Sequence, residues 1–179
     1  MTHLPQLKIL HLLSQRPDST GSGIFIQAMM REAAVLGHKN FLVAGISSHD
    51  DGRLIDGIDA EGVLFVKFDG TDVNFPIPGM SDVMPYESSR FGDLSQGDLE
   101  VYEKAFSQRL QRAVDHFKPD IIHSHHLWIV SSMARRLYPH IPMVTTCHGS
   151  DLRQFQNCPH LRARVLKGCR KIEVVMALS

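Results

Sequence analysis

Short apolar segments alternate along the chain with longer segments whose apolar residues recur every three or four positions. The short segments, residues 7–13, 41–46, 63–68, 121–124, 142–147 and 172–178, are predicted strands, and we expect the last to be buried. Apolar residues at helical spacing occur in the segments that end near Gly37, Pro119, Leu137 and Gly168, which are predicted helices. This alternation predicts an α/β fold: a Rossmann-like parallel sheet of about six strands with helices on both faces.

Residues 69–97 interrupt the alternation with an irregular insert. The insert holds Pro76, Pro78, Pro85 and four glycines among scattered Phe and Met residues. An unstructured connection of this length is uncommon in a compact domain, so we expect the insert to be either functional or mobile. The helix that follows starts at Ser95, whose side chain suits an N-cap.

Composition and charge exclude several classes of protein. The 179 residues suit one domain, since domains average roughly 100–200 residues. Lys and Arg together equal Asp and Glu at 19 each, so the chain lacks the basic surface of a nucleic-acid-binding protein. Three cysteines without C-x-x-C spacing argue against disulfide frameworks and zinc ribbons. No bilayer-length apolar run or secretory signal is present, so we expect a cytoplasmic protein.

Ligands of parallel α/β sheets bind beyond the carboxyl ends of the strands, which selects three segments of this chain. The first contains Gly21, Ser22 and Gly23 at a predicted helix start, where free N–H groups suit a phosphate or carboxylate. A flexible loop is the alternative. A dinucleotide-binding fingerprint fits poorly because Ile26 stands where a third glycine is needed, and no Walker-type phosphate loop is present.

The second segment is rich in histidine. Six of the eleven histidines lie between His116 and His148. In a strand, His123 and His125 point to the same side, while His126 lies opposite or on the following loop. We expect His123 to have a structural role and His125 and His126, at the carboxyl end of the strand, to bind ligand through hydrogen bonds or charge.

The third segment runs from Cys147 to Asp151. Gly149 permits a sharp turn after the strand, and Asp151 is either a ligand-binding residue or the N-cap of the next helix. Cys147 and His148 are adjacent in a strand and so point apart, which argues against a nucleophile pair. Cys147, His148 and the other histidines lack the spacing of known zinc motifs, so no metal site is expected.

Together and in this order, these segments resemble the N-terminal half of a retaining glycosyltransferase of the GT-B fold, family four (formerly group one). The family opens with a strand, a G-S-G-like turn and a helix that closes in G-H, here Gly21–Gly23 and Gly37-His38. Its fourth strand reads like P-D-h-h-H-x-H, which matches residues 119–125. Its fifth reads like P-h-h-x-T-x-H-G-x-D, which matches residues 142–151. The insert has no counterpart in this pattern.

The resemblance implies transfer of a sugar from a nucleotide sugar, such as a UDP- or GDP-sugar, with retention of configuration and without a metal. Gly21, Ser22 and Gly23 would lie near the donor diphosphate, and His148 would be the catalytic residue beside the transferred sugar. His125, His126, Gly149 and Asp151 would line the acceptor side of the cleft. The acceptor would be a glycan, a lipid or a small molecule.

The resemblance also implies that the nucleotide-sugar-binding domain, with its E-x7-E motif, is absent from residues 1–179. We therefore expect an acceptor-binding domain that is inactive alone and works with its own C-terminal domain. A freestanding Rossmann-like ligand-binding module is the alternative. Phe75, Met80, Met84 and Phe91 of the insert are expected core residues, and the other reading is an apolar acceptor site or a peripheral contact with the inner face of the membrane.

Overall fold

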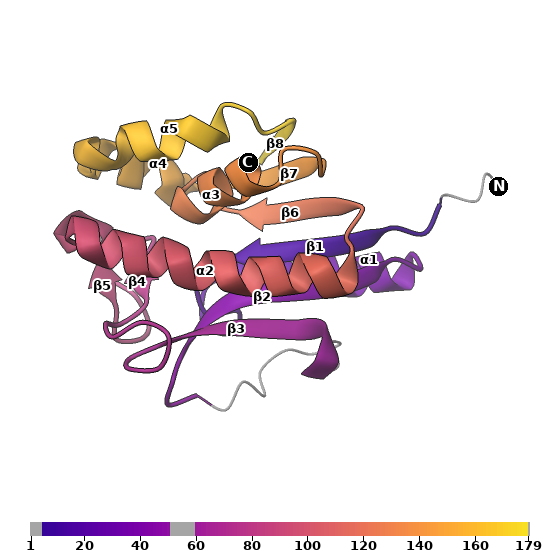
Figure 1. The fold of residues 1–179 in the computed structure, drawn as a ribbon, viewed down its shortest axis with the longest axis horizontal. Helices are drawn as coiled ribbons and strands as arrows, with labels where there is room; N and C mark the ends of the chain where they lie inside the picture. The colour runs from indigo at the N-terminus through magenta and orange to yellow at the C-terminus, as the bar shows by residue number, and fades with distance from the viewer. Residues whose placement is uncertain (1–4, 51–59, 179) are drawn as a thin grey trace.

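The computed structural model describes residues 5–50 and 60–178 and centres on one parallel sheet (Figure 1). Its six strands lie in the order β3-β2-β1-β6-β7-β8, and every neighbouring pair is parallel. Their bounds are β1 Lys8–Leu13, β2 Lys39–Ser47, β3 Val63–Phe68, β6 Ile121–His125, β7 Met143–Cys147 and β8 Val174–Ala177. The order reverses between β1 and β6, as in doubly wound folds, so the predicted fold class is confirmed.

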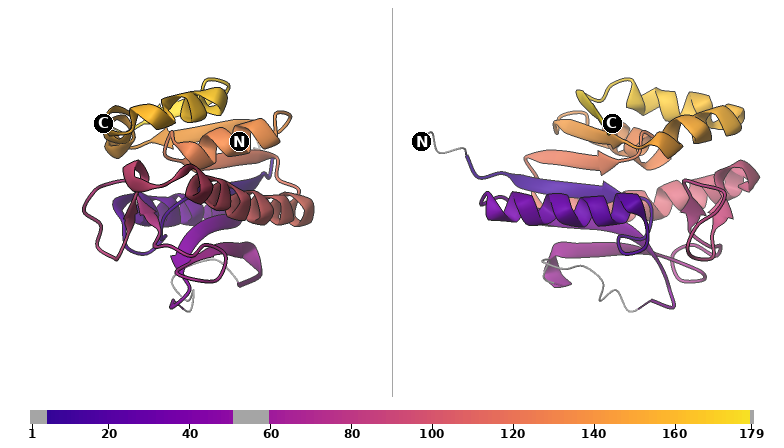
Figure 2. Two further views of the ribbon diagram at one scale, coloured as in Figure 1. Left: turned by 60° about the vertical axis from the view of Figure 1, so that its left-hand side comes forward. Right: turned by 180° about the vertical axis from the view of Figure 1, so that it is seen from behind.

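Helices cover both faces of the sheet. Helix α1 (Gly21–Val35) packs on one face, and α2 (Gln96–Phe117) and α3 (Ile129–Leu137) pack on the other (Figure 2). The short α4 (Gly149–Asn157) follows β7, and α5 (Arg162–Cys169) packs against α3. Three single 3₁₀ turns complete the described elements: η1 Ala60–Gly62, η2 Phe91–Asp93 and η3 Pro159–Leu161.

The helix ends follow their local sequence. Ser95 is the N-cap of α2, as predicted: its hydroxyl accepts the N–H of Asp98, and the Asp98 carboxylate accepts the N–H of Ser95. Lys118, in left-handed backbone conformation, ends α2 directly before Pro119, which cannot continue a helix. These caps satisfy backbone groups that every helix end leaves without an intrahelical partner.

The main core lies between the sheet and α2. The buried apolar side chains of β1 and β2 on this face meet the stripe of α2, which includes Tyr102, Phe106 and Leu110. On the opposite face, Ile26 and Met30 of α1 pack on Leu13 and Leu42. Because both faces of the central strands are covered, their sequences read as continuous apolar runs.

The insert is folded into the domain. It contains a two-stranded parallel sheet, β4 (Pro78–Gly79) and β5 (Ser89–Arg90), beyond the carboxyl ends of the main strands (Figure 1). Met80 and Phe91 are at most 2% exposed and belong to the main core cluster, and Phe75 packs against it. The expectation of core residues is therefore confirmed for Phe75, Met80 and Phe91, but Met84 is only partly buried and lies outside the core cluster.

One sequence prediction about the C-terminal part was wrong: strand β8 forms, but all its residues are exposed instead of buried. The helix that was expected to end near Gly168 ends at Cys169. A Cβ at Gly168 would overlap the Ser132 carbonyl oxygen, so glycine allows α5 to approach α3 closely.

Within residues 5–50 and 60–178, no helix is both long enough and apolar enough to cross a bilayer.

Candidate functional site

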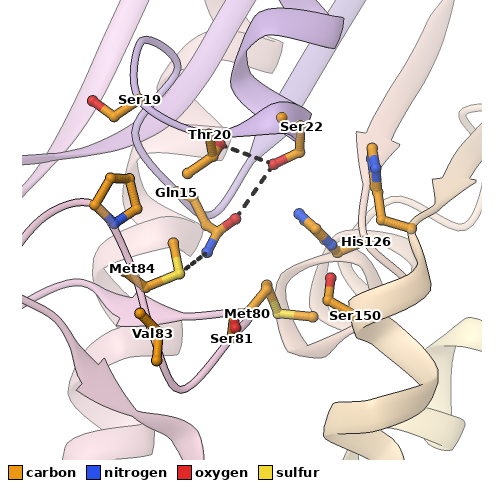
Figure 3. Close-up of a pocket in the computed structure, with 13 residues that line it drawn as sticks. Gln15, Ser19, Thr20, Ser22, Met80, Ser81, Val83, Met84, His126 and Ser150 are labelled. Atoms are coloured by element: carbon orange, nitrogen blue, oxygen red, sulfur yellow. Dashed lines mark hydrogen bonds between the residues drawn. The ribbon is translucent and has the colours of Figure 1, made fainter.

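The carboxyl ends of β1, β6 and β7 open into a pocket of about 360 Å³, which the insert closes on one side (Figure 3). Its polar side consists of Gln15, Ser19, Thr20, Gly21, Ser22, His126, His148 and Ser150. Its apolar side consists of Met80, Val83, Met84 and Pro85, with Ser81 among them. The pocket therefore lies where the fold places ligands, and it joins all three segments that the sequence selected.

Helix α1 points its N-terminus at this pocket. Thr20 is the N-cap, and its Oγ1 accepts the N–H of Gly23 at 3.0 Å. Gly21 and Ser22 line the pocket, and the Ser22 hydroxyl lies 3.3 Å from Gln15 Oε1. The first turn thus presents backbone N–H groups and a positive helix end toward the cavity.

Gly23 has a different role from the one predicted. It is buried, does not line the pocket, and its N–H is already held by the N-cap. A Cβ at this position would come within 2.6 Å of the Pro17 carbonyl oxygen and 2.7 Å of that of Arg16. Glycine is needed here because the preceding loop crosses α1, so close approach to a phosphate is not the reason.

His148 lies at the mouth of the pocket as the N-cap of α4. Its N–H donates to Asp151 Oδ2 at 3.0 Å, and its Nε2 lies 3.4 Å from His125 Nδ1. Burial, and then the neighbouring His126, lower the pKa of His148 to about 4. The imidazole is consequently neutral near pH 7 and can accept or donate a hydrogen bond.

His126 follows β6 in left-handed backbone conformation, with φ of 71°, and lines the same pocket. Its Nδ1 lies 2.6 Å from Asp151 Oδ1, and both side chains are buried. An ionised carboxylate only accepts, so Nδ1 carries the proton that it donates. The buried Nε2 of His126 has no partner among the described residues and is available to a ligand in the pocket.

Asp151 links the ends of β6 and β7. Its carboxylate accepts hydrogen bonds from His126 Nδ1–H and from the backbone N–H groups of His148 and, at 2.8 Å, of Leu127. Burial raises the pKa of Asp151, but these hydrogen bonds and the charge of His126 outweigh it and hold the pKa below its ordinary value. Asp151 is the third residue of α4, not its N-cap, and it does not line the pocket, so it positions the two pocket histidines.

The remaining predicted residues lie beside the pocket. His125 is buried against Phe25 of α1, with ring centroids 5.8 Å apart, and does not reach the cavity. Gly149 is exposed at the start of α4, and its neighbour Ser150 lines the pocket instead. His123 lies 2.8 Å from Thr146 Oγ1, as expected of a structural histidine. Burial raises the pKa of Cys147 to about 11, so its thiol is not an activated nucleophile.

For Met80 and Met84, sequence reasoning gave an apolar site only as the alternative, and it did not single out His11. Both methionines line the pocket, together with Val83 and Pro85, which no sequence pattern had marked. His11, in the middle of the first apolar run, lies beside His123 and His125, with one ring nitrogen of each within 4.8 Å of the others. Of the residues weighed for zinc, His123 and His125 belong to this group, and Cys147 and His148 do not.

Comparisons with solved structures support the fold. Two solved structures share the fold: sucrose-phosphate synthase from Thermosynechococcus elongatus (TM-score 0.50, 10% identity) and an alpha-glucosyltransferase in complex with UDP and a 13-mer DNA containing a HMU base (TM-score 0.51, 11% identity). The matches cover 84% and 97% of this chain but only 35% and 38% of those chains. No curated protein matches the chain.

A family match covers most of the sequence. Glycosyltransferase Family 4 matches residues 19–179, a range that includes α1 and all three segments at the pocket. This confirms the resemblance drawn from the strand and turn motifs. The chain belongs to Glycosyltransferase Family 4 and supplies a Rossmann-like domain of the GT-B architecture.

Proposed function

We propose that this domain forms the acceptor side of the active site in a retaining transferase that uses a nucleotide sugar. The observation that carries the proposal is the pocket itself, where the N-terminus of α1 faces the imidazoles of His126 and His148, and one buried carboxylate holds both residues. A helix N-terminus suits a phosphate, and imidazoles suit sugar hydroxyls. Both chemistries are needed where a sugar leaves a diphosphate for a hydroxyl acceptor.

Each group has an assigned role in the proposal. The first turn of α1, at Gly21 and Ser22, stabilises the negative charge of the departing nucleoside diphosphate through N–H groups and the helix dipole. His148 contacts the transferred sugar, and the free Nε2 of His126 accepts a hydrogen bond from the acceptor hydroxyl. No step of this chemistry uses a metal.

The substrates follow from the same surface. A UDP- or GDP-sugar is the proposed donor, and the alpha-glucosyltransferase that shares the fold was solved in complex with UDP. A glycan, lipid or small-molecule acceptor enters along the wall of Met80, Val83 and Met84, which favours one with an apolar part. The zero net charge argues against a nucleic-acid acceptor. We place the enzyme in the cytoplasm, where Val83, 85% exposed, provides an apolar contact for the inner membrane surface.

The proposal requires a second, nucleotide-sugar-binding domain, so sugar transfer by the 179-residue chain alone would contradict it. In an enzyme that carries both domains, His148→Ala should lower turnover at least roughly 100-fold, the range of a positioned catalytic group. Its urea midpoint should change little, because the Nε2 of this ring makes one long contact. His160→Ala, an exposed histidine, is the matched control. Full turnover by folded His148→Ala would remove His148 from the mechanism.

A further inference from the structure

Three buried histidines lie together inside the domain, on the face of the sheet that α1 covers. The strand register pairs His11 of β1 with His123 of β6, and His125 follows two residues later on the same face. One ring nitrogen of each lies within 4.8 Å of the others, and each side chain is at most 5% exposed. We propose that these three imidazoles form a binding site for a late first-row transition-metal ion, with Zn²⁺ as the reference ion.

The surroundings of His11 leave its Nδ1 available to a metal ion. Asn40 donates its side-chain N–H to the Met30 carbonyl of α1 at 2.9 Å, so its Oδ1 is left as the acceptor toward His11. His11 Nε2, 2.9 Å from that oxygen, must therefore carry the proton. The lone pair is then on Nδ1, which is buried and has no partner among the described residues.

In each of the other two rings, one nitrogen also contacts a polar neighbour and the other remains available to a metal ion. His123 Nε2 lies 2.8 Å from Thr146 Oγ1, which leaves Nδ1 as its metal-binding atom. His125 Nδ1 faces His148 at 3.4 Å, while its buried Nε2 has no partner among the described residues. Metal-ligating histidines characteristically have one nitrogen held by such an outer contact, which sets the ring orientation.

The donor set selects the class of ion. The group consists of three imidazoles and contains neither a carboxylate nor a thiol. Such a set favours Zn²⁺, Co²⁺, Ni²⁺ or Cu²⁺ over Mg²⁺ or Ca²⁺, which prefer oxygen ligands. Tetrahedral coordination needs ligand nitrogens about 3.3 Å apart, so the rings must turn slightly inward.

The metal site that the sequence weighed and set aside joined Cys147 and His148 to the histidines of β6, whereas this site combines His123 and His125 with His11 and uses neither Cys147 nor His148. None of its three ligands lines the pocket, although His125 contacts His148. A bound ion would join β1 to β6 at the point where the strand order reverses, under α1. Its role would be structural, and it can be tested without sugar transfer.

The first experiment uses the native 179-residue chain, purified without a histidine tag and stripped with a chelator. Co²⁺ titration should give the visible absorption of a low-coordinate cobalt–nitrogen site, saturating at one ion per chain, and Zn²⁺ should abolish it. Long-range ¹H–¹⁵N spectra of the imidazoles should shift for His11, His123 and His125 when Zn²⁺ is added. This measurement needs no substitution, so it remains informative if a variant fails to fold.

Two variants and a control locate the ion. His11→Gln should abolish the one-to-one complex, whereas Asn40→Ala, which keeps all three ligands, should weaken Zn²⁺ affinity roughly 10–100-fold. His160→Gln removes an exposed histidine and should leave the affinity unchanged. The proposal is overturned if the native chain takes up no stoichiometric metal, if folded His11→Gln binds as tightly as the native chain, or if only exposed histidines shift.

Discussion

Asp151 is the side chain on which both pocket histidines depend, and its removal gives a sharp test of this geometry. In Asp151→Ala, the His126 Nδ1–H and the N–H groups of Leu127 and His148 all lose their acceptor. The chain contains a matched control. Asp98 is also the third residue of its helix and also accepts the N–H of the N-cap, Ser95, at 3.0 Å, but it lies at the surface.

The expected magnitude follows from burial. Hydrogen bonds to a charged group contribute about 1.5–3 kcal/mol each, and removal of one partner of a buried charged pair costs about 3–5 kcal/mol. We therefore expect Asp151→Ala to lower the free energy of unfolding by about 4 kcal/mol. The groups around Asp98 are exposed to water, which replaces the lost carboxylate, so Asp98→Ala should cost far less.

Urea unfolding of the 179-residue chain, followed by circular dichroism at pH 7, measures both variants. With an m-value of about 2 kcal/mol/M, a loss of about 4 kcal/mol lowers the unfolding midpoint by about 2 M. The ratio between the two variants is the decisive quantity. Equal midpoints for Asp151→Ala and Asp98→Ala would refute the idea that one buried carboxylate holds the ends of β6 and β7 together.

Three further outcomes are expected from the same unfolding assay. Gly23→Ala should lower the midpoint, since its Cβ would meet backbone oxygen at 2.6 Å, whereas Gly21→Ala has no neighbour within 4 Å and should not; equal midpoints would contradict the packing explanation. Gly168→Ala should cost at least about 2 kcal/mol by overpacking against α3, with Gly149→Ala as the open control, and a stable Gly168→Ala would count against that contact. The pKa of Asp151 in the folded chain lies below its ordinary value of 3.8, so the ionised carboxylate stabilises the fold fully above pH 3.8 and loses this effect at lower pH. The difference in unfolding midpoint between the native chain and Asp151→Asn should therefore shrink from pH 5 to 2, and a constant difference would contradict this.

The sheet could be predicted because its strands carry their own signal. Central strands covered on both faces need apolar side chains on both, and this produced the apolar runs at β1 and β2. The exposure of β8 could not be predicted in the same way. Val174 and Val175 are as apolar as the central strands, and only the strand order shows that they lie at an edge.

The segments that form the candidate site could be predicted, but the contacts between residues far apart along the chain could not. The rule on strand ends placed His126 and His148 in one region, and the structure brings both to the pocket. The role of Asp151 stayed open because its main partner, His126, is 25 residues away. His11 was missed because its pairing with His123 depends on β1 lying next to β6, which no local pattern reveals.

Strand β8 has a consequence for handling the isolated chain. Val174, Val175 and Met176 are 36–50% exposed, and β8 is the edge strand opposite β3 in the described sheet. It contains no proline and no charged side chain, the features that commonly keep an open strand from pairing with a second molecule. Self-association through this edge should therefore rise with protein concentration, and Val175→Lys should suppress it.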